Sequence, residues 1–368
     1  MDSKKQVITL GDVASYINGY AFKPDDRGTE GLPIIRIQDL TGSANDLGYY
    51  NGEYPKKIEI NNGDILISWS GSLGIYTWNN GKALLNQHIF KVEFDKVKIE
   101  KSYFVYAVQK KIEEMKTKTH GATMKHIVKK DFESTLIPFP SLKEQKEIAT
   151  KLDKIRAAIA RRKEELKLLD DLIKARFVEM FGNPEVICKD WIEKPLGELC
   201  EKVIRYPTFY GMEYLESGTR VIRIGNILED GHMDVEDNNY VFVYNGVNND
   251  FPETVIEIND IIMAVRGDGS AAKRIGIIRE NKLVGANISP NLIRIKANHN
   301  IDPIYLFSFL TGEVGQKRLG AYVNKTAKKN IAAKDIVKVF VPTPPIEKQR
   351  EYASFVAQVD KSKFSKIA

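Results

Sequence analysis

The sequence predicts an α+β protein in which two similar mixed α/β domains are joined by long antiparallel coiled-coil helices. Two observations predict this fold class. An ordered set of short motifs occurs twice along the chain, and each copy ends in a charged segment whose apolar residues follow heptad-like spacing. We call each globular copy a head.

The repeat consists of paired motifs that keep the same order in both copies. The matching segments are 10–13 and 196–199, 35–37 and 222–224, 58–66 and 256–262, and 131–145 and 335–349. The offset between the copies drifts from 186 residues at the first pair to 204 at the last. Insertions and deletions have therefore accumulated in a duplicated domain, which is not a short-period solenoid.

The segment that follows the first head predicts one long helix. Its apolar residues recur at steps of three and four from Ile148 to Met180, with Arg162 in the one polar slot. Such spacing, sustained over this length, favours a coiled-coil helix. A helix over Lys143–Phe181 would be about 58 Å long at about 1.5 Å per residue. The Gly-Asn-Pro sequence at 182–184 is a stop signal.

The second copy ends in a similar segment that begins at Ile346, with Phe364 or Ile367 as its last apolar candidates. Two such helices in one chain should pair with each other. The residues predicted to form this helix pair and to contact partners are Ile148, Leu152, Ile155, Ile159, Leu166, Leu169, Ile173, Phe355 and Val359. The predicted boundaries are 1–141 for the first head, 142–183 for the central helix, 184–344 for the second head and 345–368 for the C-terminal helix.

Each head is expected to contain short strands, exposed loops and one aromatic-rich helix. The Leu-Gly-Asp or Leu-Gly-Glu opening predicts a strand leading into a turn, and the β-branched runs predict buried strands. The expected strands include 34–37 and 65–69 in the first head and 221–224 and 261–265 in the second. A further strand should contain 86–90, with 287–291 as its counterpart. We expect a largely antiparallel sheet.

Composition indicates a reduced, cytoplasmic protein without a membrane span. The two cysteines, Cys188 and Cys200, are too few for a disulfide framework and lack zinc-site spacing. The N-terminus has no apolar stretch behind it, and no window approaches 18 apolar residues. Lysine and arginine exceed aspartate and glutamate by six, and the basic residues cluster at matching places late in each head. A basic patch that recurs is harder to explain as a merely solvated surface.

A search for catalytic motifs finds none that is complete. The five histidines form no His-x-x-x-His pair, so a metal site is unsupported. Gly267-Asp268-Gly269 resembles a fragment of a phosphate-binding loop, but a glycine turn is the simpler interpretation. Asp64 and Asp260 recur before strands, where an acid is usually a turn former. We expect no catalysis in this chain.

Polar and planar side chains follow the central strands of both heads, and these are the residue types that contact base edges or stack on bases. The candidates are Trp69, Ser70, Ser72, Asn86, Gln87 and His88 in the first head and Arg266, Asp268, Ser270, Lys273, Arg274 and Asn287 in the second. Phosphate contacts are expected from Lys125, Lys129, Lys130, Lys325, Lys328 and Lys329. Ordinary drift of surface loops is the alternative interpretation, and Trp69 alone is more typical of a core residue.

These motifs, in this order, resemble the specificity subunits of type I restriction-modification systems. The resemblance covers nearly the whole chain through Leu-Gly-Asp at 10–12, Gly-Asp-Ile-Leu-Ile at 63–67, Ile-Pro-x-Pro-x-x-x-x-Gln at 137–145, Phe-x-x-Met-Phe-Gly-Asn-Pro at 177–184 and the second copy. Each motif alone is weak, whereas the ordered duplicate is specific. The resemblance implies a non-catalytic DNA-binding subunit. Its two target-recognition domains would each recognise half of a bipartite site, with the helices setting the spacing.

The resemblance also implies the partners. They are double-stranded DNA, two methyltransferase subunits that carry S-adenosylmethionine, and separate motor and nuclease subunits, with no cofactor in this chain and no membrane partner. Two other interpretations stay open: a coiled-coil scaffold that binds proteins without DNA specificity, and an enzyme in its own right. Salt-sensitive binding to duplex DNA would distinguish the first of these from the main hypothesis. The second needs a metal-carboxylate cluster or a cofactor loop.

Overall fold

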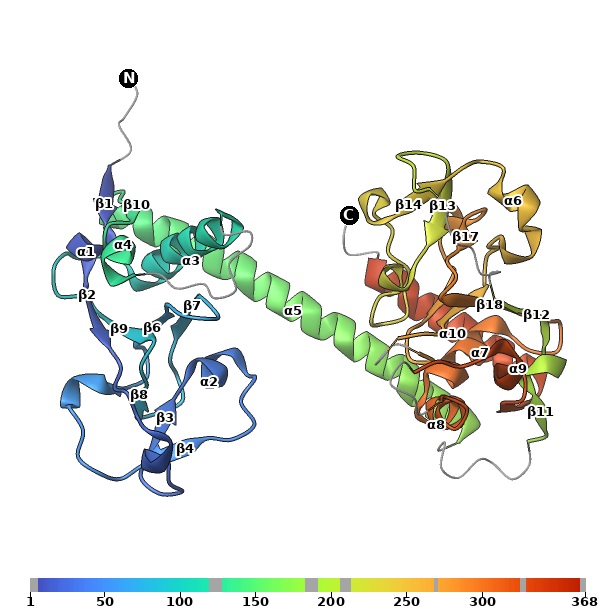
Figure 1. Cartoon of the computed structure of the whole chain (residues 1–368), viewed down its shortest axis with the longest axis horizontal. Helices are drawn as coiled ribbons and strands as arrows, with labels where there is room; N and C mark the ends of the chain where they lie inside the picture. The colour runs from blue at the N-terminus through green and yellow to red at the C-terminus, as the bar shows by residue number, and fades with distance from the viewer. Residues whose placement is uncertain are drawn as a thin grey trace. The chain divides into compact units, whose positions relative to one another are not determined.

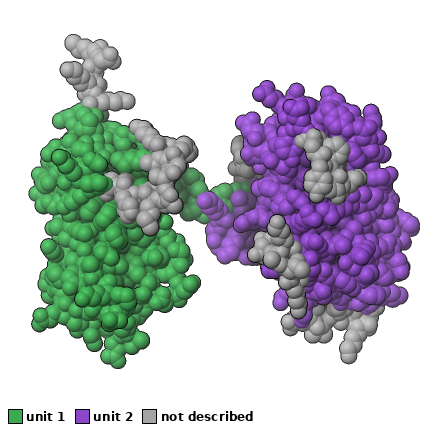
Figure 2. Space-filling model, in the orientation of Figure 1, with its two compact units in different colours: residues 1–162 green, residues 163–368 purple. Residues whose placement is uncertain are grey.

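The computed structural model describes residues 6–118, 128–182, 191–205, 213–267, 271–324 and 329–364. The chain divides into two compact units, unit 1 over Met1–Arg162 and unit 2 over Lys163–Ala368 (Figure 2). Each unit contains one head with strands and helices in a matching order (Figure 1). The predicted fold class, two similar α+β heads joined by long helices, is confirmed.

The central sheet of the first head is antiparallel and encloses the main core of that head. Its order is β2 (Ser15–Asn18), β9 (Ile89–Glu93), β6 (Ile65–Ser68) and β7 (Gly74–Thr77). All four residues of β6 are buried, as predicted from the apolar run Ile65–Ile67 with which it begins. Phe90 and Phe132 pack on Tyr16 in edge-to-face geometry, with ring centroids 6.1 and 5.0 Å away.

A second sheet, which the sequence did not separate from the first, completes this head. Its order is β4 (Gly48–Tyr50), β3 (Leu32–Ile35), β8 (Ala83–Leu85) and β5 (Glu59–Ile60). Strands β3 and β8 are parallel, while the other pairs are antiparallel. The expectation of one largely antiparallel sheet is thus corrected to two sheets, one of them mixed.

Short helices and a terminal strand pair close the first head. Strand β1 (Val7–Thr9) pairs with β10 (Leu136–Pro138). Strand β1 leads directly into the Leu-Gly-Asp opening, which forms the helical turn α1 (Leu10–Val13) capped by the Thr9 side chain, in agreement with the expected strand and turn. The remaining helical segments are η1 (Pro24–Asp26), α2 (Ile37–Thr41), η2 (Lys56–Ile58), α3 (Lys101–Lys118) and α4 (Lys129–Glu133).

The second head repeats this plan. The order of its central sheet is β12 (Cys200–Arg205), β18 (Leu292–Ala297), β15 (Ile261–Ala264) and β16 (Ile275–Ile277). The order of its second sheet is β14 (Val241–Val243), β13 (Thr219–Ile222) and β17 (Asn287–Ile288). Its terminal strand pair is β11 (Glu193–Pro195) with β19 (Phe340–Pro342). Its helical segments are η3 (Leu196–Glu198), η4 (Ile224–Asn226), η5 (Asp237–Asn239), α6 (Val247–Asp250), η6 (Pro252–Thr254), η7 (Asn281–Leu283), α7 (Pro303–Thr311), α8 (Glu313–Gly320) and α9 (Ala333–Ile336).

Helix α5 (Leu142–Phe181) has 40 residues and confirms the predicted long helix. The glutamine of the repeated Pro-x-Pro motif fixes its start. Gln145 is 1 % exposed, donates to Pro140 O at 2.9 Å and accepts from Glu100 N at 2.9 Å. Gln349 makes the matching bonds to Pro344 O and Asp302 N at the start of α10 (Ile346–Phe364). Helix α5 ends where Gly182 adopts a φ of 90°, as the stop signal predicts.

Within unit 2, helix α10 runs antiparallel to the end of α5. The pair is joined by ion pairs from Arg176 to Glu351 at 3.0 Å and from Lys363 to Asp170 at 2.7 Å. As the residue number rises in one helix it falls in the other, which fixes the antiparallel direction. Of the residues predicted to form the pair, Val359 is buried, and Leu152, Leu166, Leu169, Ile173 and Phe355 are half-buried. By contrast, Ile148, Ile155 and Ile159 are 38, 56 and 52 % exposed.

Candidate nucleic-acid interface

A repeated backbone turn follows the equivalent strand in both heads and begins with an arginine. Strand β3 leads into Arg36 and α2, and β13 leads into Arg223 and η4. The residue three positions later caps each turn through the same bond. Asp39 Oδ2 accepts from Arg36 N at 2.8 Å, and Asn226 Oδ1 accepts from Arg223 N at 2.8 Å. The two arginines are therefore structurally equivalent.

The side chains of these two arginines have different partners. Arg36 Nε lies 3.0 Å from Asp39 Oδ2, and its Nη2 lies 3.5 Å from the Asp46 carboxylate and donates to the Asp46 carbonyl. The hydrogen bond to Asp39 raises the pKa of Arg36, which is 16 % exposed. Arg223 is exposed, and its Nη2 donates to Asn239 O at 3.4 Å. Among the described residues, no carboxylate pairs with Arg223.

The segment that joins the two sheets of a head is also repeated, in a register that corrects the sequence alignment. Asn86 N bonds to Ile35 O in the first head, and Ser289 N bonds to Ile222 O in the second. The matching residues for Asn86, Gln87 and His88 are therefore Ser289, Pro290 and Asn291, two positions beyond the counterparts expected from sequence. These residues precede strands β9 and β18 and do not lie within them.

In the first head, the predicted aromatic candidates form one cluster. The Trp69 ring stacks on Phe90 with centroids 5.7 Å apart, and the His88 ring lies edge-on to it at 4.8 Å. Trp69 Nε1 donates to Asn18 Oδ1 at 3.3 Å. Trp69 is half-buried against the core, so it resembles the core residue of the alternative interpretation as much as a stacking surface.

His88 adopts a φ of 72°, which is uncommon for a residue with a side chain. Its Nδ1 is buried, without a hydrogen-bond partner among the described residues. Ser72 and Gln87 are exposed beside this cluster, whereas Ser70 and Asn86 are half-buried. Asn86 Oδ1 accepts from Gln87 N at 2.9 Å, so this side chain shapes the turn.

In the second head, the structure removes one predicted candidate. Asn287 lies in strand β17 and is 1 % exposed. Its side-chain nitrogen donates to Asn248 Oδ1 at 3.0 Å, and its oxygen accepts from Ile288 N at 2.9 Å. This residue has no polar group available to a ligand, because both ends of its amide are bonded inside the head. Asn287 thus lies in a strand, as the sequence predicts, but its buried side chain cannot make the base contact expected of it.

The other predicted residues of the second head have mixed surroundings. Arg274 donates to Ile227 O at 3.0 Å and lies 3.4 Å from Glu229, so the head itself already engages its guanidinium. Lys273 and Arg266 are exposed. Asp268 and Ser270 lie outside the described residues.

The lysines predicted to contact phosphates are only partly described. Lys130 and Lys329 are exposed. Lys129 donates to Tyr16 O at 2.9 Å and lies 3.6 Å from Glu133, so it also has a structural role. Lys125, Lys325 and Lys328 lie outside the described residues. All three described lysines are exposed, so phosphates are within their reach, and phosphate contacts do not select a base sequence.

A groove of about 840 Å³ in the second head gathers polar residues that the sequence search did not select. Its lining includes Tyr214, Arg223, Asn226, Asp234, Ser289 and Asn291. Tyr214 is 57 % exposed. The signal available in the sequence was the Ile-Arg-Ile motif at 35–37 and 222–224, which indicated the repeat but gave no role to its arginine.

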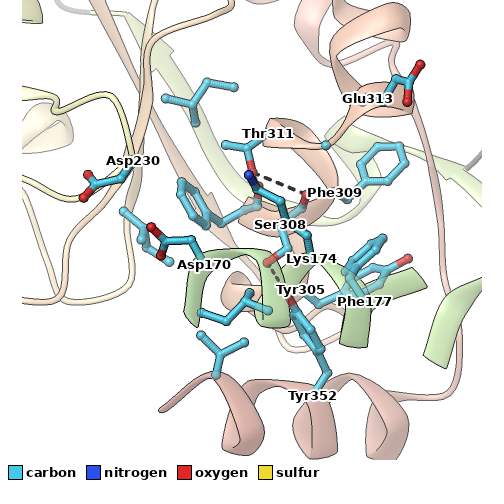
Figure 3. Close-up of a pocket in the computed structure, with 18 of the residues that line it drawn as sticks. Asp170, Lys174, Phe177, Asp230, Tyr305, Ser308, Phe309, Thr311, Glu313 and Tyr352 are labelled. Atoms are coloured by element: carbon cyan, nitrogen blue, oxygen red, sulfur yellow. Dashed lines mark hydrogen bonds between the residues drawn. The ribbon is translucent and has the colours of Figure 1, made fainter. Parts of the chain in front are cut away.

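A second cavity, of about 770 Å³, lies where α5 and α10 meet the second head (Figure 3). Phe177 of α5, Tyr305 of α7 and Tyr352 of α10 form an aromatic cluster there, with Phe177 stacked on Tyr305 at 5.6 Å. The Tyr352 hydroxyl donates to Ser308 Oγ at 3.0 Å. This aromatic cluster packs α5 and α10 against α7 of the second head.

Neither a metal-binding cluster nor a membrane-spanning helix is found in the described part of the chain. No group of three or more histidine, cysteine, aspartate or glutamate side chains there could hold a metal ion. None of the described helices is long and apolar enough to cross a membrane. Burial raises the pKa of the Cys200 thiol to about 12, so this cysteine is a poor nucleophile. Cys188 lies outside the described residues.

Comparison with known proteins gives one consistent family. The model of the type I restriction modification DNA specificity domain matches residues 2–169 and again 188–367. Curated relatives include the type I restriction enzyme EcoBI specificity subunit of Escherichia coli, 28 % identical over 96 % of this chain and 78 % of its own length. The MjaVIII specificity subunit of Methanocaldococcus jannaschii is 25 % identical over 96 % of this chain and 86 % of its own length.

Solved structures share the fold at lower sequence identity. The crystal structure of a type I restriction-modification S subunit from M. genitalium gives a TM-score of 0.57 at 16 % identity, covering 99 % of this chain and 91 % of that one. A chain from a study of complex assembly and conformational transition of the type I R-M system gives a TM-score of 0.52 at 17 % identity, covering 98 % and 91 %.

Proposed function

The chain belongs to the type I restriction modification DNA specificity family, and on that premise we propose that each of its two heads recognises one half of a bipartite DNA site. Specificity subunits of such systems are not catalytic, and other subunits methylate and cleave DNA. The heads of this chain would supply the base sequence to which those activities are directed. The proposal places the chain in the cytoplasm together with the DNA.

The observation that carries this proposal is a repeated framework with different side chains at the same places. The turns after β3 and β13 keep the same capping bond, but the capping residue is Asp39 in one head and Asn226 in the other. The residue just before β9 is His88, and the equivalent residue just before β18 is Asn291. Their side chains differ, but the carbonyl of each accepts the same kind of backbone bond, from Trp69 N in the first head and from Val265 N in the second. Two heads that recognise different base sequences would keep the backbone and change these groups.

The long helix supports a second part of the proposal, in which its length sets the distance between the half-sites. Helix α5 is continuous over 40 residues, or about 60 Å at about 1.5 Å per residue. Half-sites on one side of B-DNA recur about every 34–36 Å. A helix of this length is therefore long enough to span that repeat.

The exposed side of α5 supports docking of methyltransferase subunits. Ile148, Ile155 and Ile159 lie on the predicted coiled-coil stripe and are between 38 and 56 % exposed. A stripe of large apolar residues on a soluble helix usually marks a contact with another chain. We propose that two methyltransferase subunits, which would carry S-adenosylmethionine, bind along this helix. The motor and nuclease subunits would join that complex.

The proposal is tested by measuring DNA binding of the assembled complex. We would purify the chain with its methyltransferase subunits and follow binding to random and selected duplexes by fluorescence anisotropy. We expect selection to enrich one bipartite sequence. Affinity should fall by about 10³- to 10⁵-fold between 50 and 200 mM salt if six to ten phosphates are contacted. A stable complex with no DNA binding would favour the scaffold function instead.

A further inference from the structure

We propose that Arg223 recognises a base in the second half-site, by contacting the major-groove edge of a guanine through its guanidinium. This inference rests on the proposed function and names a recognition site within one head. Arg223 is exposed at the end of β13 and borders the groove of about 840 Å³. Bidentate contact from arginine to guanine O6 and N7 is the commonest specific contact in the major groove.

The first head provides the internal comparison. Arg36 occupies the same backbone position, yet its guanidinium is held by the carboxylates of Asp39 and Asp46. A guanidinium paired in this way has fewer donors left for a base. In the second head, Asn226 replaces Asp39, and its side-chain nitrogen donates to Asn239 O at 3.0 Å. The change from carboxylate to amide therefore releases the arginine for an external partner.

The wall of the groove favours a base over a phosphate. Asp234 lines the groove, and its carboxylate accepts from Glu236 N at 2.8 Å and from the Asn239 side chain at 2.6 Å. A carboxylate fixed in the same groove as Arg223 repels a phosphate. The same wall contains Ser289 and Asn291, which add donors and acceptors of the kind that match base edges. A mixed surface of this type suits base recognition better than backbone binding.

The test compares variants by selecting duplexes from a random pool with the assembled complex at one fixed salt concentration. Arg223→Ala should reduce the preference for one guanine, in one half-site, by about 5- to 100-fold. The preferences in the other half-site should stay unchanged. Arg223→Lys keeps the charge but loses the bidentate fork, so the guanine preference should fall while overall affinity is largely kept.

A third variant recreates the clamp of the first head without removing the arginine. Asn226→Asp places a carboxylate where Asp39 stands beside Arg36, so Arg223 should pair internally and the guanine preference should again be lost. Lys334→Ala is the matched control, because this exposed lysine of α9 does not line the groove, and surface lysines contribute to DNA binding mainly through phosphates. It should weaken binding to all sequences alike. Thermal unfolding of each complex shows whether the variant is folded.

Two results would overturn the inference. Equal weakening of all sequences by Arg223→Ala would make Arg223 a phosphate contact, and an unchanged guanine preference would place it outside the interface. If Arg223→Ala fails to fold, Arg223→Lys and Asn226→Asp decide the question in the same way. A wild-type complex with no sequence preference at all would contradict the proposed function itself, which separates that failure from a failure of the role of Arg223.

Discussion

At the scale of single residues, the aspartates that precede β6 and β15, Asp64 and Asp260, are turn formers in both heads, as predicted from the sequence. Asp64 Oδ2 accepts from Asn61 N at 2.8 Å, and Asp260 Oδ2 accepts from Glu257 N at 2.7 Å. The second acid has an additional role. Its carboxylate lies 2.7 Å from Arg294 Nε, and both side chains are 1 % exposed. The corresponding pair in the first head, Asp64 with Lys91, is 3.7 Å apart and less buried.

We predict that Asp260→Ala destabilises the second head by about 3–5 kcal/mol, because it leaves the buried Arg294 without its closest carboxylate. Asp64→Ala is the matched control. It removes the same turn bond but only a longer, more exposed ion pair, so its effect should be clearly smaller. Hydrogen exchange followed by mass spectrometry reports each head separately and measures both changes. Equal loss of protection in the two variants would show that the buried ion pair adds nothing.

Stability of the second head should depend on pH through His232. Its Nδ1 lies 3.3 Å from Asp230 Oδ2. The nearby Asp230 carboxylate raises the pKa of His232, and His232 in turn lowers the pKa of Asp230 to about 2. A raised histidine pKa contributes stability that is complete below the unfolded value of about 6.5 and is lost as pH rises through the folded value.

We therefore predict that His232→Gln lowers the melting temperature by about 1–3 °C at pH 6. The difference from wild type should shrink as pH rises towards 9. Thermal unfolding across this range measures it, and Asp230→Asn should remove the same pH dependence. A difference that stays constant from pH 6 to 9 would contradict the role of the ion pair.

The candidate recognition residues were only partly predictable, because strands of two or three residues carry no register signal. The alignment of Asn86 with Asn287 rested on a shared residue type, whereas the bond from Ser289 N to Ile222 O fixes a different register. Asn287 is consequently buried, and of the two residues that line the groove in this segment, Asn291 is exposed while Ser289 is only 7 % exposed. The different fates of Arg36 and Arg223 depend on Asp39, which Asn226 replaces in the second head, and on Asp46 in the loop that follows α2.

At the scale of elements, the local patterns predicted the long helix and the buried strands, because apolar spacing records which face of an element is buried. The division of each head into two sheets was not predicted. It depends on the parallel pairing of β3 with β8, about 50 residues apart, and local spacing does not encode such a pairing. The glutamines that begin α5 and α10 were noted as motif residues, and the structure gives their bonds.

The apolar stripe of α5 gives a prediction for partner binding. Ile155→Glu should weaken binding of a methyltransferase subunit by at least tenfold, because it places a charge in an apolar contact. It should hardly change the stability of the chain, since Ile155 is 56 % exposed. Isothermal titration calorimetry measures the binding. Lys154→Glu, an exposed change on the same helix, is the control, and equal loss in both variants would contradict a docking role for the stripe.

The length of α5 gives a prediction for the DNA site. Inserting one heptad after Arg162 adds about 10.5 Å of helix and leaves the contacts of Asp170 and Arg176 with α10 unchanged. We expect the spacer between the half-sites to lengthen while both half-site sequences stay the same. Selection from random duplexes measures the spacer, and an unchanged spacer would contradict the proposal that the helix sets it.

At the scale of the whole molecule, the duplication was the feature most accessible from sequence. Its anchors are residues that fix turns, caps and strand starts, and these keep their identity while loops change. The family match to both halves of the chain agrees with that duplication. The base sequence recognised by each head was not predictable, because it depends on loop geometry and on ion pairs between residues distant in sequence.

The most direct test of the account is to express this chain with its methyltransferase subunit in a host that lacks the system and to map methylated adenines across the genome by long-read sequencing. We predict a single bipartite motif whose two halves are separated by a fixed number of base pairs that are not recognised. Absence of new methylation, while the two proteins still form a stable complex, would contradict the proposal that this chain directs methylation to a DNA sequence.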